Sequence, residues 1–523
     1  MSSSGQDSQE WVTAVARPNT PLFLSFLISG QDRTAIEAHT GLPLGFDNIR
    51  RTGIQLQYDR DELAHATAMV RERSSNEGIA FFERFAASCL ESCRALLQTA
   101  DELAIDQRTR AHDRESVEPR LASYFAGAVA LGTFLQTLII VQFELEDVLR
   151  RFVADRLDHP SEHETQRASG ALQIALEATD ELRNLKEMLE LAALVQRTVP
   201  HYREWIAADP IAVVTRIAHQ HRLIWASVES YQARFGWMGR RYYSGDPIAA
   251  IDIVLRLQNL LGEDCEARLA DMDVRRNSHL QERERTIAML GGDDMARRLA
   301  DILSLYMHLR SYRLDVFFMA HERVVPLFED VAQLLALQSY DDTPYLSWQE
   351  LMNGIHDRCN GQELTSRAAA RRGGFGFVSR NGHAEWIPSS GRATSATASG
   401  APTGVIQGAS GWGGHLQGRV RVVASDSDML RMQPGEILVT TMTQPRLMLA
   451  VEKAGAIVTD EGGMLCHAVL VSREFDLPCV IGTETATHVL RTGDIVNVDA
   501  TAGVVQLVTS SRSTTQIQED YGP

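Results

Sequence analysis

Cysteine is scarce in this sequence, with six residues in a chain of 523. They are Cys89, Cys93, Cys265, Cys359, Cys466 and Cys479, and no two of them form a Cys-X-X-Cys pair. This usage excludes a framework of disulfides and a structural zinc site of the paired-cysteine type. It is typical of a reducing compartment, so we expect a cytoplasmic protein.

Lysine is scarcer still, since Lys186 and Lys453 are the only two lysines among 51 basic residues. A Walker-type phosphate loop ends in Gly-Lys followed by Ser or Thr, and this tripeptide does not occur. Folds that hold nucleotide phosphates with paired lysines are equally hard to place. If the protein uses ATP, we expect another polypeptide to bind the nucleotide.

Basic charge is not in excess, because 68 acidic residues outnumber the basic ones and the formal net charge is −17. Such a chain is repelled by nucleic acid and by anionic lipid surfaces, so we expect no nucleic-acid partner. The first residues lack the basic and apolar regions of a secretory signal. The uncharged stretch 121–143 is long enough to span a membrane. Polar residues interrupt it, however, so we predict a buried central helix and no membrane partner.

Helical periodicity dominates the first part of the chain, and the total length predicts two or three domains. Apolar residues recur at intervals of three and four, with charges between them, in residues 59–71, 78–106, 162–199, 210–235, 247–261 and 293–337. We predict a large all-α N-terminal domain over residues 1–358. Cys89 and Cys93 lie one helical turn apart within it, and we interpret them as a buried packing pair.

Composition and period both change after the helical part. Residues 359–414 are rich in Gly, Ser, Thr and Ala, which is typical of a flexible linker. Short β-branched runs follow at 419–423, 436–440, 456–458, 478–482, 494–499 and 503–508, with helical patterns between them at 443–454, 467–475 and 484–491. We predict a small α/β domain over residues 415–510 and a disordered tail over residues 511–523.

The stretch 459–483 carries the chemistry of the C-terminal domain. It follows a predicted strand, the pair Gly462 and Gly463 lets the backbone approach a ligand closely, and His467 begins a short helix. The positive end of a helix favours a nearby dianion and disfavours an imidazolium, which keeps the histidine neutral and nucleophilic. A neutral imidazole can attack phosphorus, and the helix end then holds the phosphoryl charge. Arg473 adds positive charge to the same helix but, six residues further on, can point away from His467.

This stretch strongly resembles the phosphohistidine signature of the mobile, or swivelling, domain of phosphoenolpyruvate-utilising enzymes, such as phosphoenolpyruvate synthase, pyruvate phosphate dikinase and rifampin phosphotransferase. The matching residues are Thr459, Gly462, Gly463, His467, Ala468, Arg473, Glu474, Pro478, Gly482 and Thr483. The resemblance implies that His467 is transiently phosphorylated while its domain moves between a nucleotide site and an acceptor site. It also implies ATP or phosphoenolpyruvate as donor, with Mg²⁺, and a phosphoryl site formed by Thr459, Gly462, Gly463, Cys466 and Arg473.

Cys466 departs from the family, which usually has Ser or Thr at this position. Because a thiol is a weaker hydrogen-bond partner than a hydroxyl, a hydroxyl contact to the phosphoryl group is in question here. A thiol beside a helix N-terminus can also have a lowered pKa and respond to oxidation. We favour a packing role for Cys466 over this redox alternative.

The helical part has a more diffuse similarity to the substrate-binding region of rifampin phosphotransferase and synthase-like proteins. The similarity lies in Trp11 with Arg17 and Pro18, and in residues 221–237, 242–247, 309–313 and 345–350. It implies that the helical domain binds the acceptor, with His221, Arg310, Arg313 and His321 facing an interior pocket. Arginine there suits a phosphoryl group or an anionic substrate.

The sequence contains neither an ATP-grasp nucleotide domain nor the pyruvate-binding barrel of the dikinases. We therefore expect a separate ATP-grasp subunit as partner, which also binds most of the metal, and we assign no metal ligands to this chain. The leading hypothesis is a phosphotransferase component in which His467 passes a phosphoryl group to a small molecule bound by the helical domain. The alternative is a non-enzymatic phospho-carrier or regulatory adaptor whose helical domain binds a protein. A degenerate relative with a structural role is the least favoured reading, because Gly462, Gly463 and His467 are all present.

Overall fold

The computed structural model divides the chain into two compact units. The first comprises Met1–Asp180 and Glu190–Ala393, and the second comprises Glu181–Leu189 and Thr394–Pro523. The structure describes residues 10–16, 19–52, 55–106, 112–157, 160–357, 361–380, 383–388, 405–424, 428–429, 431–443, 447–460 and 467–509. The predicted fold class is confirmed at the level of a large helical region and a C-terminal α/β domain.

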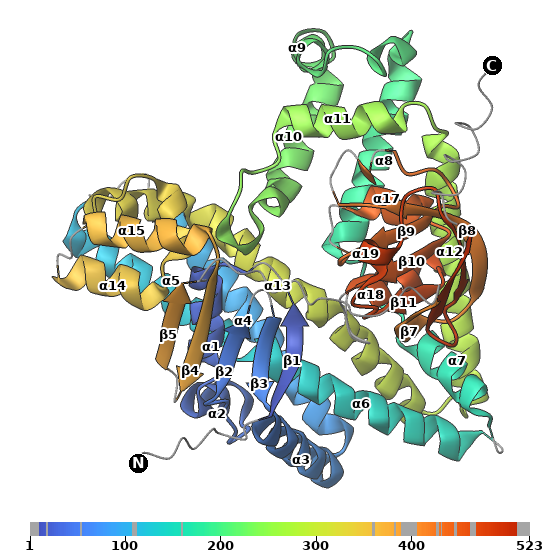
Figure 1. Cartoon of the computed structure of the whole chain (residues 1–523), viewed down its shortest axis with the longest axis horizontal. Helices are drawn as coiled ribbons and strands as arrows, with labels where there is room; N and C mark the ends of the chain where they lie inside the picture. Colours follow the sequence, from blue (N-terminus) through green and yellow to red (C-terminus); the bar gives the residue numbers. More distant parts are fainter. Residues whose placement is uncertain are drawn as a thin grey trace, which may run out of the picture. The chain divides into compact units, whose positions relative to one another are not determined.

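Helices form most of the N-terminal region (Figure 1). Their bounds are α1 Pro21–Gly30, α2 Arg33–Thr40, α3 Arg60–Glu77, α4 Ile79–Asp106, α5 Arg114–Gly132, α6 Phe134–Arg156, α7 Glu162–Leu172, α8 Asp180–Thr198, η1 Tyr202–Trp205, α9 Pro210–Gln220, α10 Arg222–Phe235, η2 Gly236–Tyr243, α11 Ala250–Leu260, α12 Cys265–Met289, α13 Asp294–Leu334, η3 Tyr340–Tyr345, α14 Trp348–Asp357 and α15 Gly361–Arg372. Aspartate caps begin several of them, since Asp59, Asp113 and Asp293 accept backbone N–H groups at the starts of α3, α5 and α13.

The core of this unit lies around α13, which packs along α4 and also contacts α5 and α6. Cys89 and Cys93 are both fully buried in α4, as predicted. The apolar run 121–143 forms the end of α5 and the start of α6. This helical segment is long and apolar enough to span a membrane, but 72% of its most apolar window is buried inside the protein. Such burial is what a central core helix shows.

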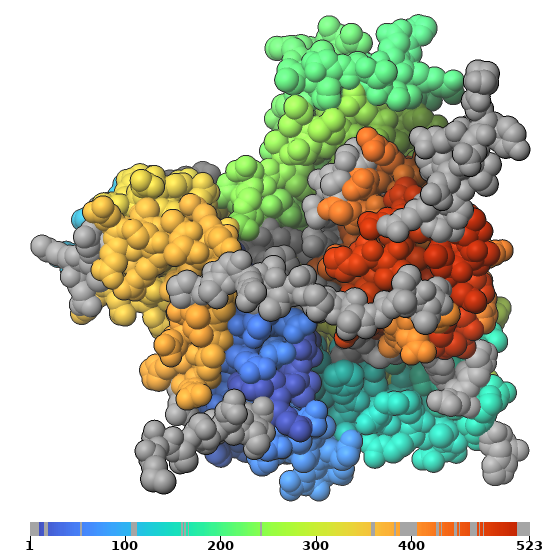
Figure 2. Space-filling view, viewed as in Figure 1, coloured from blue at the N-terminus to red at the C-terminus, as the bar shows by residue number. Residues whose placement is uncertain are grey.

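The helical unit also contains a five-stranded antiparallel sheet, which the term all-α leaves out. Its strands are β1 Trp11–Ala16, β2 Ile49–Thr52, β3 Gln55–Asp59, β4 Phe375–Arg380 and β5 His383–Pro388, in the order β1-β3-β2-β4-β5. Strand β4 pairs with β2, so residues 375–388 lie beside the N-terminal strands (Figures 1 and 2).

Part of the predicted linker is therefore ordered structure, namely α15, β4 and β5. Inside and outside positions alternate along β4, where Phe375 and Phe377 are buried and Gly376 and Val378 are half-buried. A Cβ on Gly376 would lie 2.9 Å from the carbonyl oxygen of Arg51, so close strand approach requires glycine here. Residues 391–400, the most linker-like part, and the tail 511–523 lie outside the described residues.

The second unit contains an eight-stranded sheet in the order β6-β13-β12-β8-β9-β10-β11-β7. Its strands are β6 Val405–Gln407, β7 Ala409–Trp412, β8 His415–Val422, β9 Ile437–Thr440, β10 Ala456–Thr459, β11 Cys479–Ile481, β12 Ile495–Asp499 and β13 Val504–Thr509, and its helices are α17 Met448–Lys453, α18 His467–Phe475 and α19 Ala486–Val489. All six predicted strands are present. Strands β8, β9, β10 and β11 are parallel to one another, whereas the pairs outside them are antiparallel.

Strands β6 and β7 come from the predicted linker as well. Their glycines are required by close packing, because a Cβ on Gly408 would lie 2.6 Å from the carbonyl oxygen of Ile481. A Cβ on Gly411 would lie 3.0 Å from Val469 of α18 and 3.1 Å from Cys479 of β11. The glycine content that predicted flexibility is thus partly a consequence of tight sheet and helix packing.

Candidate functional site

His467 is the first residue of α18, as the sequence predicted. The helix follows β10, and it packs against β10, β11 and β7. Strands β9, β10 and β11 are parallel, so their carboxyl ends meet at one edge of the sheet, which is where ligands bind in open α/β folds. The backbone thus places His467 at a helix N-terminus after a central strand. The His467 side chain and residues 461–466, with Gly462, Gly463 and Cys466, lie outside the described residues.

Asp460 is the last described residue before His467, and its side chain anchors the chain at the end of β10. Asp460 is 6% exposed, and its carboxylate accepts hydrogen bonds from three donors. Oδ1 accepts from Thr483 Oγ1 at 3.1 Å and from the Thr487 backbone N–H at 3.0 Å, and Oδ2 accepts from Thr487 Oγ1. Its carbonyl oxygen also accepts from the Glu484 N–H at 2.9 Å. The chain at Asp460 is therefore fixed to the turn that leads into α19.

Thr459 lies at the end of β10 and is fully buried. Its carbonyl oxygen accepts from both the backbone N–H and the hydroxyl of Thr483, at 3.0 and 3.1 Å. The turn that supplies these donors is tight, with positive φ values of 65° at Gly482 and 60° at Glu484. Thr459 thus helps to hold this turn at the end of β10.

Arg473 lies in the last turn of α18. Its guanidinium carbon is 6.0 Å from the ring centre of Trp412, and the Trp412 indole N–H donates to Asp476 at 2.9 Å. Trp412 pairs with Cys479 at the beginning of β11. This contact is at the end of α18 opposite to His467, so the described geometry shows Arg473 packing against Trp412 of β7. The predicted contact of Arg473 with a phosphoryl group stays a prediction.

In the helical unit, the structure separates the four predicted substrate residues. His221 lies in the break between α9 and α10, where its ring packs edge-on against buried Trp205 at 5.4 Å. Arg313 is 3% exposed, and its guanidinium donates to the carbonyl oxygens of Phe134 and Leu135, each at 3.1 Å. These bonds tie α13 to the first turn of α6. Arg310 lies half-buried three residues before Arg313 in α13.

His321 lies elsewhere on α13, inside a polar and aromatic cluster. It is fully buried, and its Nε2 lies 2.8 Å from the hydroxyl oxygen of Tyr340 in η3. The ring of Tyr243, from η2, stands 4.2 Å from the His321 ring. Burial, followed by the nearby positive charge of Arg240, lowers the pKa of His321 to about 3. His321 is therefore a neutral imidazole at any physiological pH.

Two further charged residues complete this cluster. Arg240 Nε lies 3.3 Å from Glu322 Oε2, and the Arg240 guanidinium carbon is 5.7 Å from the Tyr340 ring centre. Burial is the main reason that the pKa of Glu322 and that of Tyr340 are raised. Among these residues, sequence reasoning assigned a role only to His321. The others belong to short 3₁₀ segments and a long helix, whose periodicity gives no sign that they converge.

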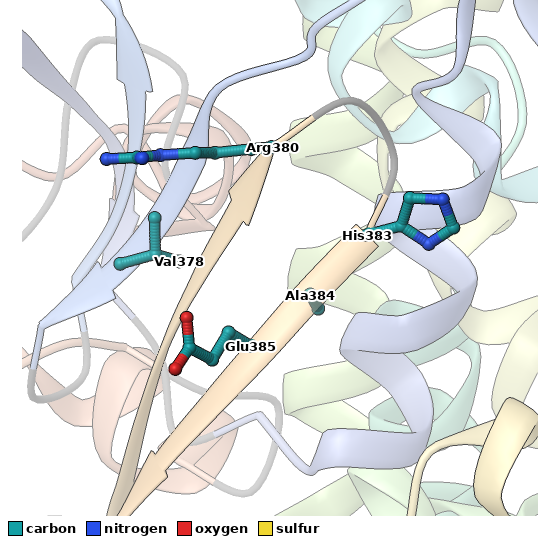
Figure 3. Close-up of a pocket in the computed structure, with 5 residues that line it drawn as sticks. All are labelled: Val378, Arg380, His383, Ala384 and Glu385. Carbon is teal, nitrogen blue, oxygen red and sulfur yellow. The ribbon is translucent and has the colours of Figure 1, made fainter.

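A cavity of about 420 Å³ is present on the β4–β5 hairpin, lined by Val378, Arg380, His383, Ala384 and Glu385 (Figure 3). Val378, Arg380 and Glu385 point to one side of the hairpin, and His383 points to the other. Arg380, His383 and Glu385 are all exposed. It is a surface hollow that contains none of the predicted site residues. Within the described part of the chain, no three His, Cys, Asp or Glu side chains converge as a metal site.

Comparison with known proteins identifies the C-terminal domain. A family model described as "PEP-utilising enzyme, mobile domain" matches residues 432–503. The probable phosphoenolpyruvate synthase of Archaeoglobus fulgidus is 50% identical over 92 residues, which are 18% of this chain and 12% of that protein. The phosphoenolpyruvate synthase of Pyrococcus furiosus is 52% identical over 88 residues, which are 17% and 11% of the two chains.

An uncharacterised phosphotransferase of Bacillus subtilis, YvkC, is 40% identical over 98 residues, which are 19% of this chain and 12% of that protein. The matched region thus spans only about an eighth of the length of these relatives. The similarity concerns the mobile domain.

Proposed function

We propose, on the premise that residues 432–503 are the mobile domain of a phosphoenolpyruvate-utilising enzyme, that this chain is the histidine-bearing component of a phosphotransferase. His467 accepts a phosphoryl group and passes it to a small molecule bound by the helical unit. The observation that carries the proposal is the position of His467 at the first residue of α18, the helix that comes next in the chain after the central parallel strand β10.

The chemistry follows from that position. A ring nitrogen of His467 attacks the phosphorus of the donor, the bond from phosphorus to the leaving oxygen breaks, and the leaving group takes that electron pair. The first N–H groups of a helix have no partner within the helix, so the start of α18 favours the negative charge of the resulting phosphohistidine. In the second step an acceptor oxygen attacks phosphorus, the P–N bond breaks, and His467 regains its electron pair. The acceptor proton passes to a base or to water.

The donor in this proposal is ATP or phosphoenolpyruvate, and a separate ATP-grasp subunit binds it together with Mg²⁺. The sequence has no Walker loop and only two lysines, which supports assigning the nucleotide to another polypeptide. When bound, the divalent ion neutralises phosphate charge. Because the described residues supply no cluster of metal ligands, no step above depends on a metal held by this chain.

The test is to incubate the full chain with each donor and with a candidate ATP-grasp partner, and to measure acid-labile phosphate by intact-protein mass spectrometry. We expect a gain of one phosphoryl group in wild type and none in His467→Ala. His488→Ala is the matched control, because His488 is an exposed histidine of the same domain, in α19. Equal labelling of wild type and His467→Ala would refute the assignment.

The alternative is a phospho-carrier or regulatory adaptor whose helical unit binds a protein. The buried polar cluster around His321 favours a small-molecule site. An assay with the isolated, phosphorylated chain distinguishes the two hypotheses. Transfer of its phosphate to a metabolite without other proteins supports the phosphotransferase. Transfer that requires a protein acceptor supports the adaptor.

A further inference from the structure

The cluster around His321 runs from the surface of the helical unit into its core. The side chains of Glu322 and Arg240 are 31% and 16% exposed, Tyr340 is half-buried, and His321 is 0% exposed. Three separate elements contribute, namely α13, η2 and η3. Polar groups on one continuous path of this kind are accessible at one end and enclosed at the other.

Several atoms in this cluster are buried and make no hydrogen bond to any described residue. They are His321 Nδ1, Arg240 Nε, Arg240 Nη1 and Glu322 Oε2. The approach of Arg240 Nε to Glu322 is an ion pair at 3.3 Å without hydrogen-bond geometry. Each buried polar atom left unsatisfied costs about 1–3 kcal/mol, so several of them in one place indicate that another polar molecule completes the network.

Backbone strain occurs at the same place. Tyr243 has a φ of 66°, in the left-handed region that bulky residues rarely adopt. Its ring is 1% exposed and is held at 4.2 Å from the His321 ring. Such strain costs about 1–3 kcal/mol and tends to concentrate at functional sites. The strain, the unmet polar atoms and the graded burial are independent observations about one location.

We propose that Arg240, Tyr340 and His321 bind the oxyanion end of a small molecule, a carboxylate or a phosphate, which in the proposed function is the phosphoryl acceptor. This identification of the ligand as acceptor rests on the proposed function, whereas the binding site itself does not. A cationic ligand is disfavoured because it would meet the guanidinium of Arg240.

Each residue has a distinct part in this site. Arg240 supplies the N–H donors of Nε and Nη1, which make no hydrogen bond to a described residue, on a planar guanidinium that suits carboxylate and phosphate oxygens. His321 has two parts in the site, the first of which is to position Tyr340, because its Nε2 holds the Tyr340 hydroxyl. Nδ1 of His321 remains for a polar atom of the ligand. Glu322 competes with the ligand for Arg240. When the ligand binds, Arg240 gives up its ion pair with Glu322, which lacks hydrogen-bond geometry, and donates hydrogen bonds to the ligand instead.

Calorimetric titration of the full chain with inorganic phosphate and, separately, with pyruvate tests the proposal. The titrations use the His467→Ala background, so that phosphorylation plays no part and a negative result does not bear on the role of His467. We expect at least one of the two anions to bind at millimolar concentration or tighter. The pair of probes distinguishes a phosphate site from a carboxylate site.

Arg240→Gln should weaken that binding by at least about tenfold, as expected for the loss of charged hydrogen bonds. Arg268→Gln is the matched control, because the Arg268–Glu263 pair has nearly the same exposure, 19% and 31%, and lies on other elements. Arg240→Lys, which keeps the charge but loses the fork, should bind with intermediate affinity.

Equal binding by the Arg240→Gln and Arg268→Gln variants would overturn the proposal. Absence of binding of both anions to the parent protein would overturn it too, and would leave ordered water as the partner of these atoms. His321→Asn keeps a polar group but cannot hold Tyr340 in the same way, and we expect it to weaken binding while Arg240 is intact. Tryptophan fluorescence confirms that each variant is folded.

Discussion

Burial of a neutral His321 makes the stability of the helical unit depend on pH. The pKa of His321 is lowered to about 3 in the folded chain, whereas histidine in an unfolded chain has a pKa of about 6.5. Between these values the unfolded state binds more protons than the folded state, so stability is lost as the pH falls. Below the unfolded pKa of about 6.5, each pH unit lowers the free energy of unfolding by about 1.4 kcal/mol per proton taken up. Between pH 7 and pH 5 this one group should therefore lower the free energy of unfolding by about 2 kcal/mol.

Urea unfolding followed by tryptophan fluorescence measures this loss. Six of the seven tryptophans lie in the helical unit, and the seventh is Trp412. In a Trp412→Phe background the signal therefore reports on the helical unit alone. Wild type and His321→Asn are compared at pH 7 and pH 5. Other titrating groups are common to both chains and cancel in the difference.

We expect His321→Asn to be less stable at pH 7, because the contact with Tyr340 and the ring packing are lost. Its decline between pH 7 and pH 5 should be smaller than that of wild type by about 2 kcal/mol. His383→Asn, at an exposed position of the same unit, should decline as wild type does. Parallel pH curves for wild type and His321→Asn would refute the reasoning, since they would mean that His321 takes up a proton without unfolding.

Two further substitutions test how the parts of the fold are held. Asp460→Ala should destabilise the C-terminal domain by about 2–4 kcal/mol through loss of its buried hydrogen bonds, and it should slow phosphorylation. Thr487→Val, which removes one donor, should have a smaller effect. Wild-type stability of Asp460→Ala in chemical unfolding would contradict this prediction. Gly132→Ala would place a Cβ 2.5 Å from the carbonyl oxygen of Phe26, so we expect a loss of about 2 kcal/mol or more in thermal or urea unfolding. Gly262→Ala, where nothing lies within 4 Å, should be close to neutral, and equal effects of the two alanines would argue against the close packing.

The strands and helices of residues 415–510 could be predicted almost completely from the sequence, whereas β6 and β7 of the same sheet lay in the predicted linker. Its strands are short β-branched runs, and the helix from His467 to Phe475 has the bounds that the pattern indicated. Local signals were sufficient because each element is bounded by Gly, Pro or Asp. What the pattern did not reveal was the role of Asp460, whose partners Thr483 and Thr487 are more than twenty residues away. An acid directly after a buried strand, two residues before a diglycine, is the signal that could have pointed to it.

The helical unit was harder to predict, for two physical reasons. Helical periodicity identifies a buried face but does not say which residues of distant helices meet on it, so Arg313 was predicted to face a pocket although its donors are used by α6 carbonyl groups. Strand pairing across more than 300 residues likewise leaves no local trace. The glycines at 376, 408 and 411 were interpreted as part of a flexible linker. Glycine is favoured both in flexible linkers and where backbones pack closely, so composition alone does not distinguish the two.

The pairing of β2 with β4 has a consequence for how this protein is made and cut. During synthesis β2 cannot pair with β4 until residues 375–380 have emerged, more than 300 residues later. This long sequence separation predicts that the β2–β4 pair forms slowly. A fragment that stops after α14 would display β2 as an unpaired edge, a surface prone to aggregation. Expression of the helical unit by itself should therefore end beyond Pro388 rather than at residue 358.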